Sequence, residues 1–85
     1  NMNKLENLKK KLIYRSSYRG TKEMDILLSS FVKKHIDILS ETDLHDLSKV
    51  LDLEDEVIYN FYNNNFIDSP LKENKILQMI KDFKI

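Results

Sequence analysis

The chain has 85 residues, of which 41% are hydrophobic and 33% charged, with 14 basic and 14 acidic side chains and no cysteine. This length predicts one domain, residues 1–85, which would bury only about 60–65% of the surface of its unfolded chain, so a deep catalytic cleft is not expected. The composition is that of a globular domain rather than a disordered segment. The lack of cysteine excludes disulfides and thiolate ligands and fits a reducing compartment.

No apolar run approaches the roughly 20 residues that a membrane-spanning helix needs, and no charged leader with a cleavage site opens the chain. We therefore expect no membrane insertion and no export. The expected location is the cytoplasm, or the mitochondrial matrix if a transit peptide has been removed. Asn1 stands before Met2 and is expected to be a cloning remnant.

The charges are unevenly distributed although their sum is zero. Residues 1–22 carry seven basic side chains and one acidic side chain, whereas residues 37–56 carry eight acidic side chains and one basic side chain. Such an asymmetry bears on solubility and on the orientation of partners.

The first predicted helix covers residues 3–18, where Leu5, Leu8 and Leu12 recur at helical spacing. Gly20, the only glycine, is expected to interrupt the helical pattern. Glycine enters left-handed backbone conformations at little cost and is common just after a helix end. We therefore predict a bend at this position.

The second helix is expected to begin after Thr21, a suitable N-cap. Glu23 and Asp25 lie in its first turns, where negative charge suits the positive end of the helix dipole. Its core-facing stripe, with spacings of three and four residues, consists of Met24, Leu27, Leu28, Phe31, Val32 and His35.

Three shorter helices are expected to follow. A capping-box-like segment at residues 40–43 begins the third, Glu54 or Asp55 begins the fourth, and the asparagine run at residues 63–65 ends it. Ser69-Pro70 is expected to begin the fifth, because proline at the first helical position loses no hydrogen bond. The inward-facing residues are predicted to be Leu44, Leu47, Val50 and Leu51, then Val57, Ile58 and Phe61, then Leu71, Ile76, Leu77, Ile80 and Phe83.

The predicted fold class is therefore all-α, a small bundle of about five short helices. No long stretch alternates with a period of two, and no Asn-Gly or Asp-Gly hairpin turn occurs. No residue pattern recurs at a fixed period, which argues against a helical-repeat protein.

The bend around Gly20 is the predicted functional site. It would direct Arg19, Glu23 and Asp25 outward, and Tyr18 would add amphipathic contact surface. Arg19 could form a forked bond with a partner's carboxylate, and Gly20 could allow a partner's backbone to approach closely. The competing interpretation is a solvent-exposed ion pair between Arg19 and Glu23, with structural packing for the tyrosines.

A longer motif resembles a known family. The residues are Leu12-x-Tyr14-x-Ser16-x-x-Arg19-Gly20-x-x-Glu23-x-Asp25-x-Leu27-Leu28-x-x-Phe31, followed by Lys34-His35-Ile36, Ile58-Tyr59-x-Phe61 and Ile80-Lys81-Asp82-Phe83. They resemble the succinate dehydrogenase assembly factors that promote covalent FAD attachment to the flavoprotein subunit. The chain departs from the family in having Ser17 and Tyr18 where many relatives have basic residues, Val32 where alanine is frequent and Phe61 where tryptophan is frequent.

The resemblance implies a small, non-enzymatic five-helix protein that binds the flavoprotein subunit of succinate dehydrogenase, with that of fumarate reductase as a further candidate client. FAD would be the client's cofactor, attached by the client's own histidine, and this chain would bind no cofactor stably. The implied partner-binding residues are Arg19, Gly20 and Glu23, with Asp25, Tyr18 and Ser16 beside them. We expect a monomer.

Other functions have less support in the sequence. His35 and His45 lack the companion ligands of a metal site, and Ser16 or Ser17 lacks the base and structural context of a nucleophile. The basic run at residues 9–11 leaves open a helix-turn-helix-like nucleic-acid-binding domain, although the acidic third helix would repel phosphate. A generic helical adaptor for another protein also stays open.

Overall fold

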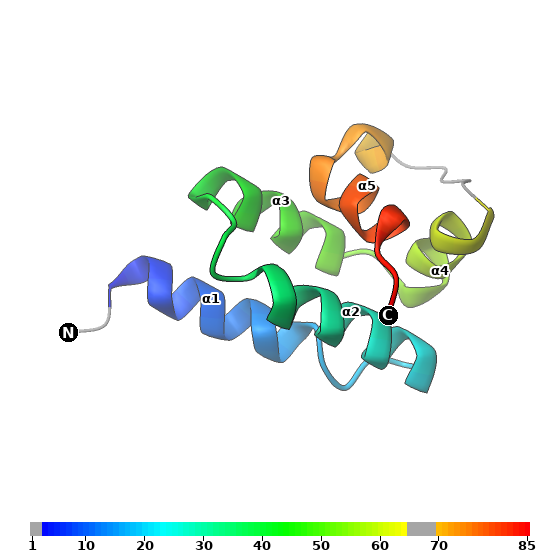
Figure 1. The fold of residues 1–85 in the computed structure, drawn as a ribbon, viewed down its shortest axis with the longest axis horizontal. Coiled ribbons are helices and arrows are strands. Elements are labelled where there is room, and N and C mark those ends of the chain that lie inside the picture. Colours follow the sequence, from blue (N-terminus) through cyan, green and yellow to red (C-terminus); the bar gives the residue numbers. More distant parts are fainter. Residues whose placement is uncertain (1–2, 65–69) are drawn as a thin grey trace.

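Five α-helices and one 3-10 turn make up the part of the chain that the structure describes, residues 3–64 and 70–85 of a computed structural model, and no strand occurs there (Figure 1). The all-α prediction is confirmed. The elements are α1 (Lys4–Arg15), α2 (Lys22–His35), α3 (Glu41–Leu51), α4 (Asp55–Asn64), η1 (Pro70–Glu73) and α5 (Lys75–Asp82). The predicted contributions of Asn65 and Ser69 lie outside the described residues.

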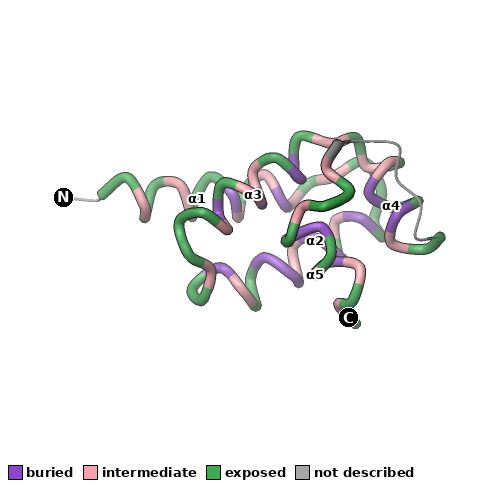
Figure 2. The backbone as a smooth tube through the Cα atoms, turned by 90° about the horizontal axis from the view of Figure 1, so that it is seen from above, coloured by how far each residue is buried: buried purple, intermediate pink, exposed green. Residues whose placement is uncertain are grey.

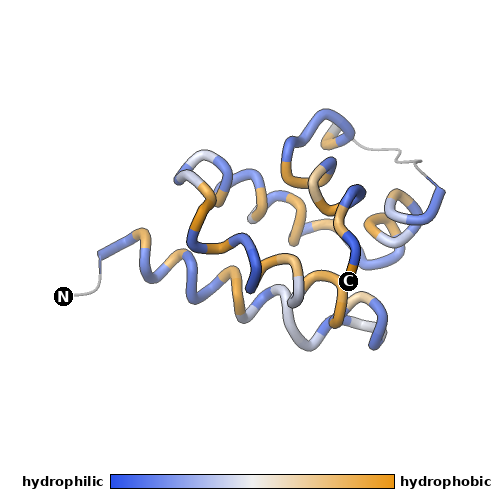
Figure 3. Tube along the Cα trace, in the orientation of Figure 1, coloured by the Kyte–Doolittle hydropathy of each residue, from blue (hydrophilic) through white to orange (hydrophobic). Residues whose placement is uncertain are grey.

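The helices bury one side each around a shared core. α1 packs against α2 and α3, and α5 packs against α3 and α4. Figure 2 shows the buried residues along the inward sides of the helices, and Figure 3 shows the matching alternation of hydrophobic and hydrophilic residues along each helix. The core consists of Leu12, Met24, Leu27, Leu28, Phe31, Val32, Ile36, Leu44, Leu47, Val50, Leu51, Ile58, Phe61, Ile76, Leu77 and Ile80. The apolar spacing thus predicted most of the core.

His35, the last residue of the stripe predicted to face the core, lies at the edge of this core. Its Nδ1 is 2.9 Å from the carbonyl oxygen of Phe31, and its ring stacks on the Phe31 ring with centroids 4.3 Å apart. The Phe83 ring meets the Phe31 ring edge-on at 5.5 Å. This aromatic group attaches the C-terminal segment to α2.

Polar side chains begin α2 and α3 where the sequence predicted. The Thr21 hydroxyl accepts the backbone N–H of Met24 at 3.2 Å, and Ser40 and Asp43 form a reciprocal capping box. Burial opposes ionisation of Asp43, but hydrogen bonds from Ser40 and the nearby Lys75 ammonium outweigh it and hold the pKa of Asp43 below its ordinary value of 3.8. The capping box is thus tied to α5 by charge.

The start of the fifth helix was predicted wrongly. Pro70 begins a 3-10 turn, and α5 starts only at Lys75, after Asn74. The Asn74 side chain accepts the N–H groups of Ile76 and Leu77 at 2.8 and 3.0 Å, so it caps a new helix instead of continuing the turn. Its amide also donates to the Asp46 carbonyl at 3.2 Å, which fixes this start against α3.

Part of the charge asymmetry is used inside the molecule. Arg15 of α1 donates to the Ser48 hydroxyl at 2.9 Å and pairs with Asp52, and Lys9 lies 3.7 Å from an Asp37 carboxylate oxygen. The basic first segment therefore packs against acidic residues that follow α2 and α3.

Candidate functional site

Residues 16–21 connect α1 to α2 and are called the corner below. The first helix ends at Arg15, three residues earlier than predicted, and Ser16 is its C-cap. Ser16 is fully buried, and its hydroxyl donates to the Ile13 carbonyl at 2.7 Å. The prediction that Ser16 belongs to a partner-binding surface is therefore contradicted, because its hydroxyl is enclosed and bonded to its own helix.

The left-handed residue of the corner is Tyr18 and not Gly20. Tyr18 has φ of 57°, and Gly20 has no positive φ. A non-glycine residue rarely adopts this conformation, and here the Tyr18 N–H donates to an Asp25 carboxylate oxygen at 3.3 Å. Tyr18 is 83% exposed as a residue, and its ring centroid lies 5.9 Å from that of Tyr14. The backbone turn thus directs a tyrosine outward, as predicted for a contact residue.

Arg19 points inward, contrary to the prediction that it would be presented to a partner. Its side chain is only 13% exposed, and its Nε donates to an Asp55 carboxylate oxygen at 2.8 Å. The two terminal nitrogens donate to backbone carbonyls of residues 15, 51 and 53 at 3.0 to 3.3 Å. The planar guanidinium thus joins the end of α1, the end of α3 and the start of α4. Because these partners use its donors, Arg19 acts here as a structural tie.

Gly20 lacks a side chain, which leaves space for the same Asp55 carboxylate. Its backbone N–H donates to the second Asp55 oxygen at 2.6 Å, and a Cβ on Gly20 would lie 3.0 Å from that oxygen. The space beside Gly20, which was predicted to admit a partner's backbone, is therefore filled by the Asp55 carboxylate. One carboxylate holds both Arg19 and Gly20 across 36 and 35 residues of sequence.

Glu23 remains available on the surface. It is exposed in the first turn of α2, and its carboxylate has no hydrogen bond or ion pair with the described part of the chain. Asp25 is half-buried, and its carboxylate accepts the backbone N–H of Tyr18 within the corner. The predicted group of outward charges is thus reduced to Glu23, next to the exposed Tyr18 ring.

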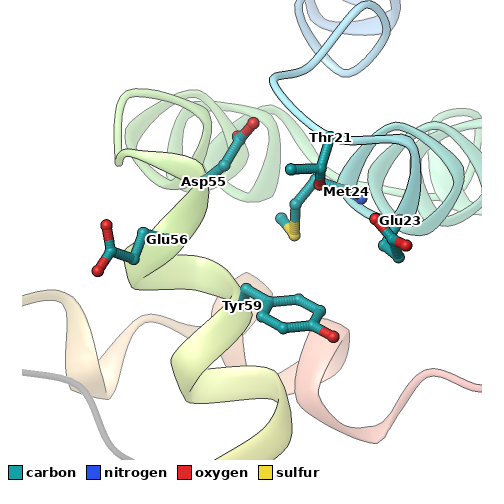
Figure 4. Close-up of a pocket in the computed structure, with 6 residues that line it drawn as sticks. All are labelled: Thr21, Glu23, Met24, Asp55, Glu56 and Tyr59. Carbon is teal, nitrogen blue, oxygen red and sulfur yellow. Dashed lines mark hydrogen bonds between the residues drawn. The ribbon is translucent and has the colours of Figure 1, made fainter.

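A surface pocket of about 380 Å³ adjoins Glu23. It lies between the first turns of α2 and α4 and is lined by Thr21, Glu23, Met24, Asp55, Glu56 and Tyr59 (Figure 4). The contribution of α4 was missed from the sequence. In the sequence, Glu54 or Asp55 indicates only a helix start, and Tyr59 occurs only in the family-like motif Ile58-Tyr59-x-Phe61.

Neither a membrane span nor a metal cluster is found in the described ranges. No helix of residues 3–64 or 70–85 combines the length and hydropathy needed to cross a bilayer. In the same ranges no three His, Cys, Asp or Glu residues come together as a possible metal site. His45 is exposed and lies 3.9 Å from Glu41, one turn earlier on α3.

Comparison with known proteins connects this fold to one family. The family described as "Flavinator of succinate dehydrogenase" matches residues 10–84. Three similar proteins are each named "Succinate dehydrogenase assembly factor 2, mitochondrial", from Meyerozyma guilliermondii, Scheffersomyces stipitis and Saccharomyces cerevisiae, with 40%, 37% and 34% identity over 89%, 92% and 93% of this chain. The chain spans 59%, 55% and 51% of their lengths, about half of each relative. The match includes the corner, α2 and all later elements, and this chain therefore belongs to the family of succinate dehydrogenase flavinators.

Proposed function

We propose that this chain is an assembly factor that binds the flavoprotein subunit of succinate dehydrogenase and promotes covalent attachment of FAD to it. Its family and the names of its relatives support this function, and the word "mitochondrial" in those names supports a location in the mitochondrial matrix. The flavoprotein subunit of fumarate reductase is a second candidate client. We propose that the chain acts as a monomer and not as an enzyme.

The observation that carries the proposal is an exposed Glu23, whose carboxylate has no partner among residues 3–64 and 70–85, beside a corner that Arg19 and Asp55 hold together. Four hydrogen bonds from the Arg19 guanidinium and one from the Gly20 amide fix the start of α2 relative to α4. A surface that is ordered before binding loses less conformational entropy when a partner docks.

The residues around the corner would therefore have different roles, and would not all be outward charges that contact the client. Glu23 would accept hydrogen bonds from the client, and Tyr18 would contribute exposed aromatic area. Arg19 and Gly20 would act through the shape of the corner. FAD would stay with the client, whose own histidine would form the bond to flavin, so this chain would need neither a nucleophile nor a stably bound cofactor.

The structure offers little support for nucleic-acid binding. Lys9, Arg15 and Arg19, from the basic first segment, each pair with an acidic side chain of this chain. Phosphate contacts would have to compete with these pairs, so a binding surface on this segment would be weakened.

Reconstitution of FAD attachment tests the proposal. Purified apo-flavoprotein subunit is incubated with FAD, with and without this chain, and covalent flavin is measured by in-gel fluorescence after denaturation. We expect wild-type chain to increase attachment and Glu23→Gln to lose most of the increase. The matched control is Glu73→Gln, an exposed carboxylate in η1, which should behave as wild type.

Two results would contradict the proposal. If the wild-type chain gives no increase and does not bind the apo-subunit, the assembly function is wrong. If Glu23→Gln and Glu73→Gln are equally active, Glu23 is not a contact residue.

A further inference from the structure

The pocket between α2 and α4 has an apolar wall. Met24 is 1% exposed as a residue, and Figure 4 shows its thioether directed into the space between Asp55 and the Tyr59 ring. Tyr59 is 45% exposed and forms the facing side. Thioether and aromatic surfaces suit an aliphatic chain or a flat cation.

The rim of this pocket is acidic. Glu23 stands on the α2 side and Glu56 on the α4 side, where its carboxylate extends away from Met24 (Figure 4). Among the described residues neither carboxylate has a hydrogen bond or an ion pair, and no basic residue lines the pocket. The third carboxylate, Asp55, has one oxygen bonded to Arg19 and the other to Gly20.

The positive ends of the helix dipoles do not cancel the negative charge of the pocket rim. Both α2 and α4 begin at the pocket, and a helix N-terminus carries about half a positive elementary charge. Two free carboxylates contribute two full negative charges, and the Asp55 charge is balanced by Arg19. The groups that line the pocket therefore sum to a negative charge, which disfavours an acidic or phosphorylated ligand.

We propose that this pocket receives a basic side chain of the client flavoprotein, an inference that rests on the proposed assembly function. The aliphatic stem packs against the exposed part of the Tyr59 ring, above the nearly buried Met24 thioether. The cationic end reaches the rim, where Glu23 accepts its hydrogen bonds and Glu56, exposed at the other side, can turn toward it. An arginine fits best, because its flat guanidinium can stack on the Tyr59 ring and bond to carboxylates in a forked geometry. This gives Glu23 a defined chemical partner, and it adds Glu56 and Tyr59 to the client-binding surface.

Binding of purified apo-flavoprotein subunit, measured by isothermal titration calorimetry at two salt concentrations, tests the pocket. Glu56→Lys should weaken binding by about tenfold or more, because it places a cation where a client cation docks. Tyr59→Ser should weaken binding through loss of the apolar wall. Glu56→Gln should reduce the salt dependence of the affinity. Circular dichroism of the variants should match wild type, because both residues are exposed, and urea unfolding should show only a small loss of stability, because a lysine in the first turn of α4 opposes the helix dipole and Tyr59→Ser removes a partly buried ring.

Glu73→Lys makes the same charge reversal on η1, outside the pocket, and should leave the affinity unchanged. Wild-type binding together with unchanged affinity in Glu56→Lys and Tyr59→Ser would overturn the pocket inference and leave the assembly function standing. Equal weakening by Glu73→Lys would also overturn it, because the effect would then be one of net charge. A wild-type dimer in solution that Glu56→Lys dissociates would instead assign the pocket to a second copy of this chain. Absence of any wild-type binding would overturn the assembly function and this inference together.

Discussion

Replacement of Arg19 by alanine distinguishes two roles for this residue, a structural tie within the fold and a contact with the client. Arg19 and Asp55 side chains are 13% and 20% exposed, and the substitution removes the ion pair and three hydrogen bonds to backbone carbonyls. Breaking a buried ion pair by removing one partner costs about 3–5 kcal/mol. Both side chains keep some access to water, so we expect the lower end of that range, about 3 kcal/mol of unfolding free energy.

The expected loss is large for a domain of this size. A loss of 1 kcal/mol lowers the melting temperature of a small domain by about 4–8 °C, so Arg19→Ala should melt roughly 12–24 °C below wild type. Urea unfolding followed by far-UV circular dichroism measures the free energy directly. Arg19→Lys keeps the charge but loses the planar fork, and should fall between wild type and Arg19→Ala.

Lys22→Ala is the matched control, because Lys22 is an exposed cation in the first turn of α2. It should change the unfolding free energy by less than about 0.5 kcal/mol. The reasoning would be refuted if Arg19→Ala unfolded at the same urea concentration as wild type and yet lost FAD attachment. Arg19 would then contact the client and not the corner.

Three further predictions concern the corner and the helix starts. Gly20→Ala should lower the unfolding free energy by about 1 kcal/mol in urea titrations, because displacing the Asp55 carboxylate costs more than the 0.4–1 kcal/mol gained from a stiffer unfolded chain. Asn74→Ala should cost about 1–2 kcal/mol in the same assay through loss of the α5 cap, and Asn74→Asp should retain most of the stability. The lowered pKa of Asp43 stabilises the fold above pH 3.8, and this contribution should disappear as the pH falls through the lower folded-state value. Acid titration of wild type and Asp43→Asn checks the sign, since the wild type should lose more stability on acidification.

Local sequence patterns were enough to predict the helices and most of the core. The apolar stripe of α2 and the caps at Thr21 and Ser40 depend on residues within one or two turns, where spacing and hydrogen-bonding chemistry decide the outcome. The 3-10 turn at Pro70 was not distinguished from a helix start, because both suit proline. The turn ends at Asn74, because the Asn74 side chain caps α5 and so starts a separate helix.

The candidate site was less predictable because its main bonds connect distant residues. The sequence indicates a free surface cation at Arg19, but in the fold its guanidinium donates to Asp55, which lies 36 residues later. No spacing rule relates two such positions. The bend itself was predicted from Gly20, but the left-handed residue is Tyr18, stabilised by a side-chain acceptor on α2. Glu23 needed no distant partner, and its exposure agrees with the prediction.

The shared carboxylate of Asp55 also restricts how the corner can diverge in evolution. Exchanging arginine and aspartate would preserve an ion pair but would set a guanidinium against the Gly20 amide, donor facing donor, and would leave three carbonyls without their donor. The polarity of the pair is thus irreversible. Homologues that abandon the acid at this position should also have lost the arginine, and their α1–α2 connection should have a different length or conformation.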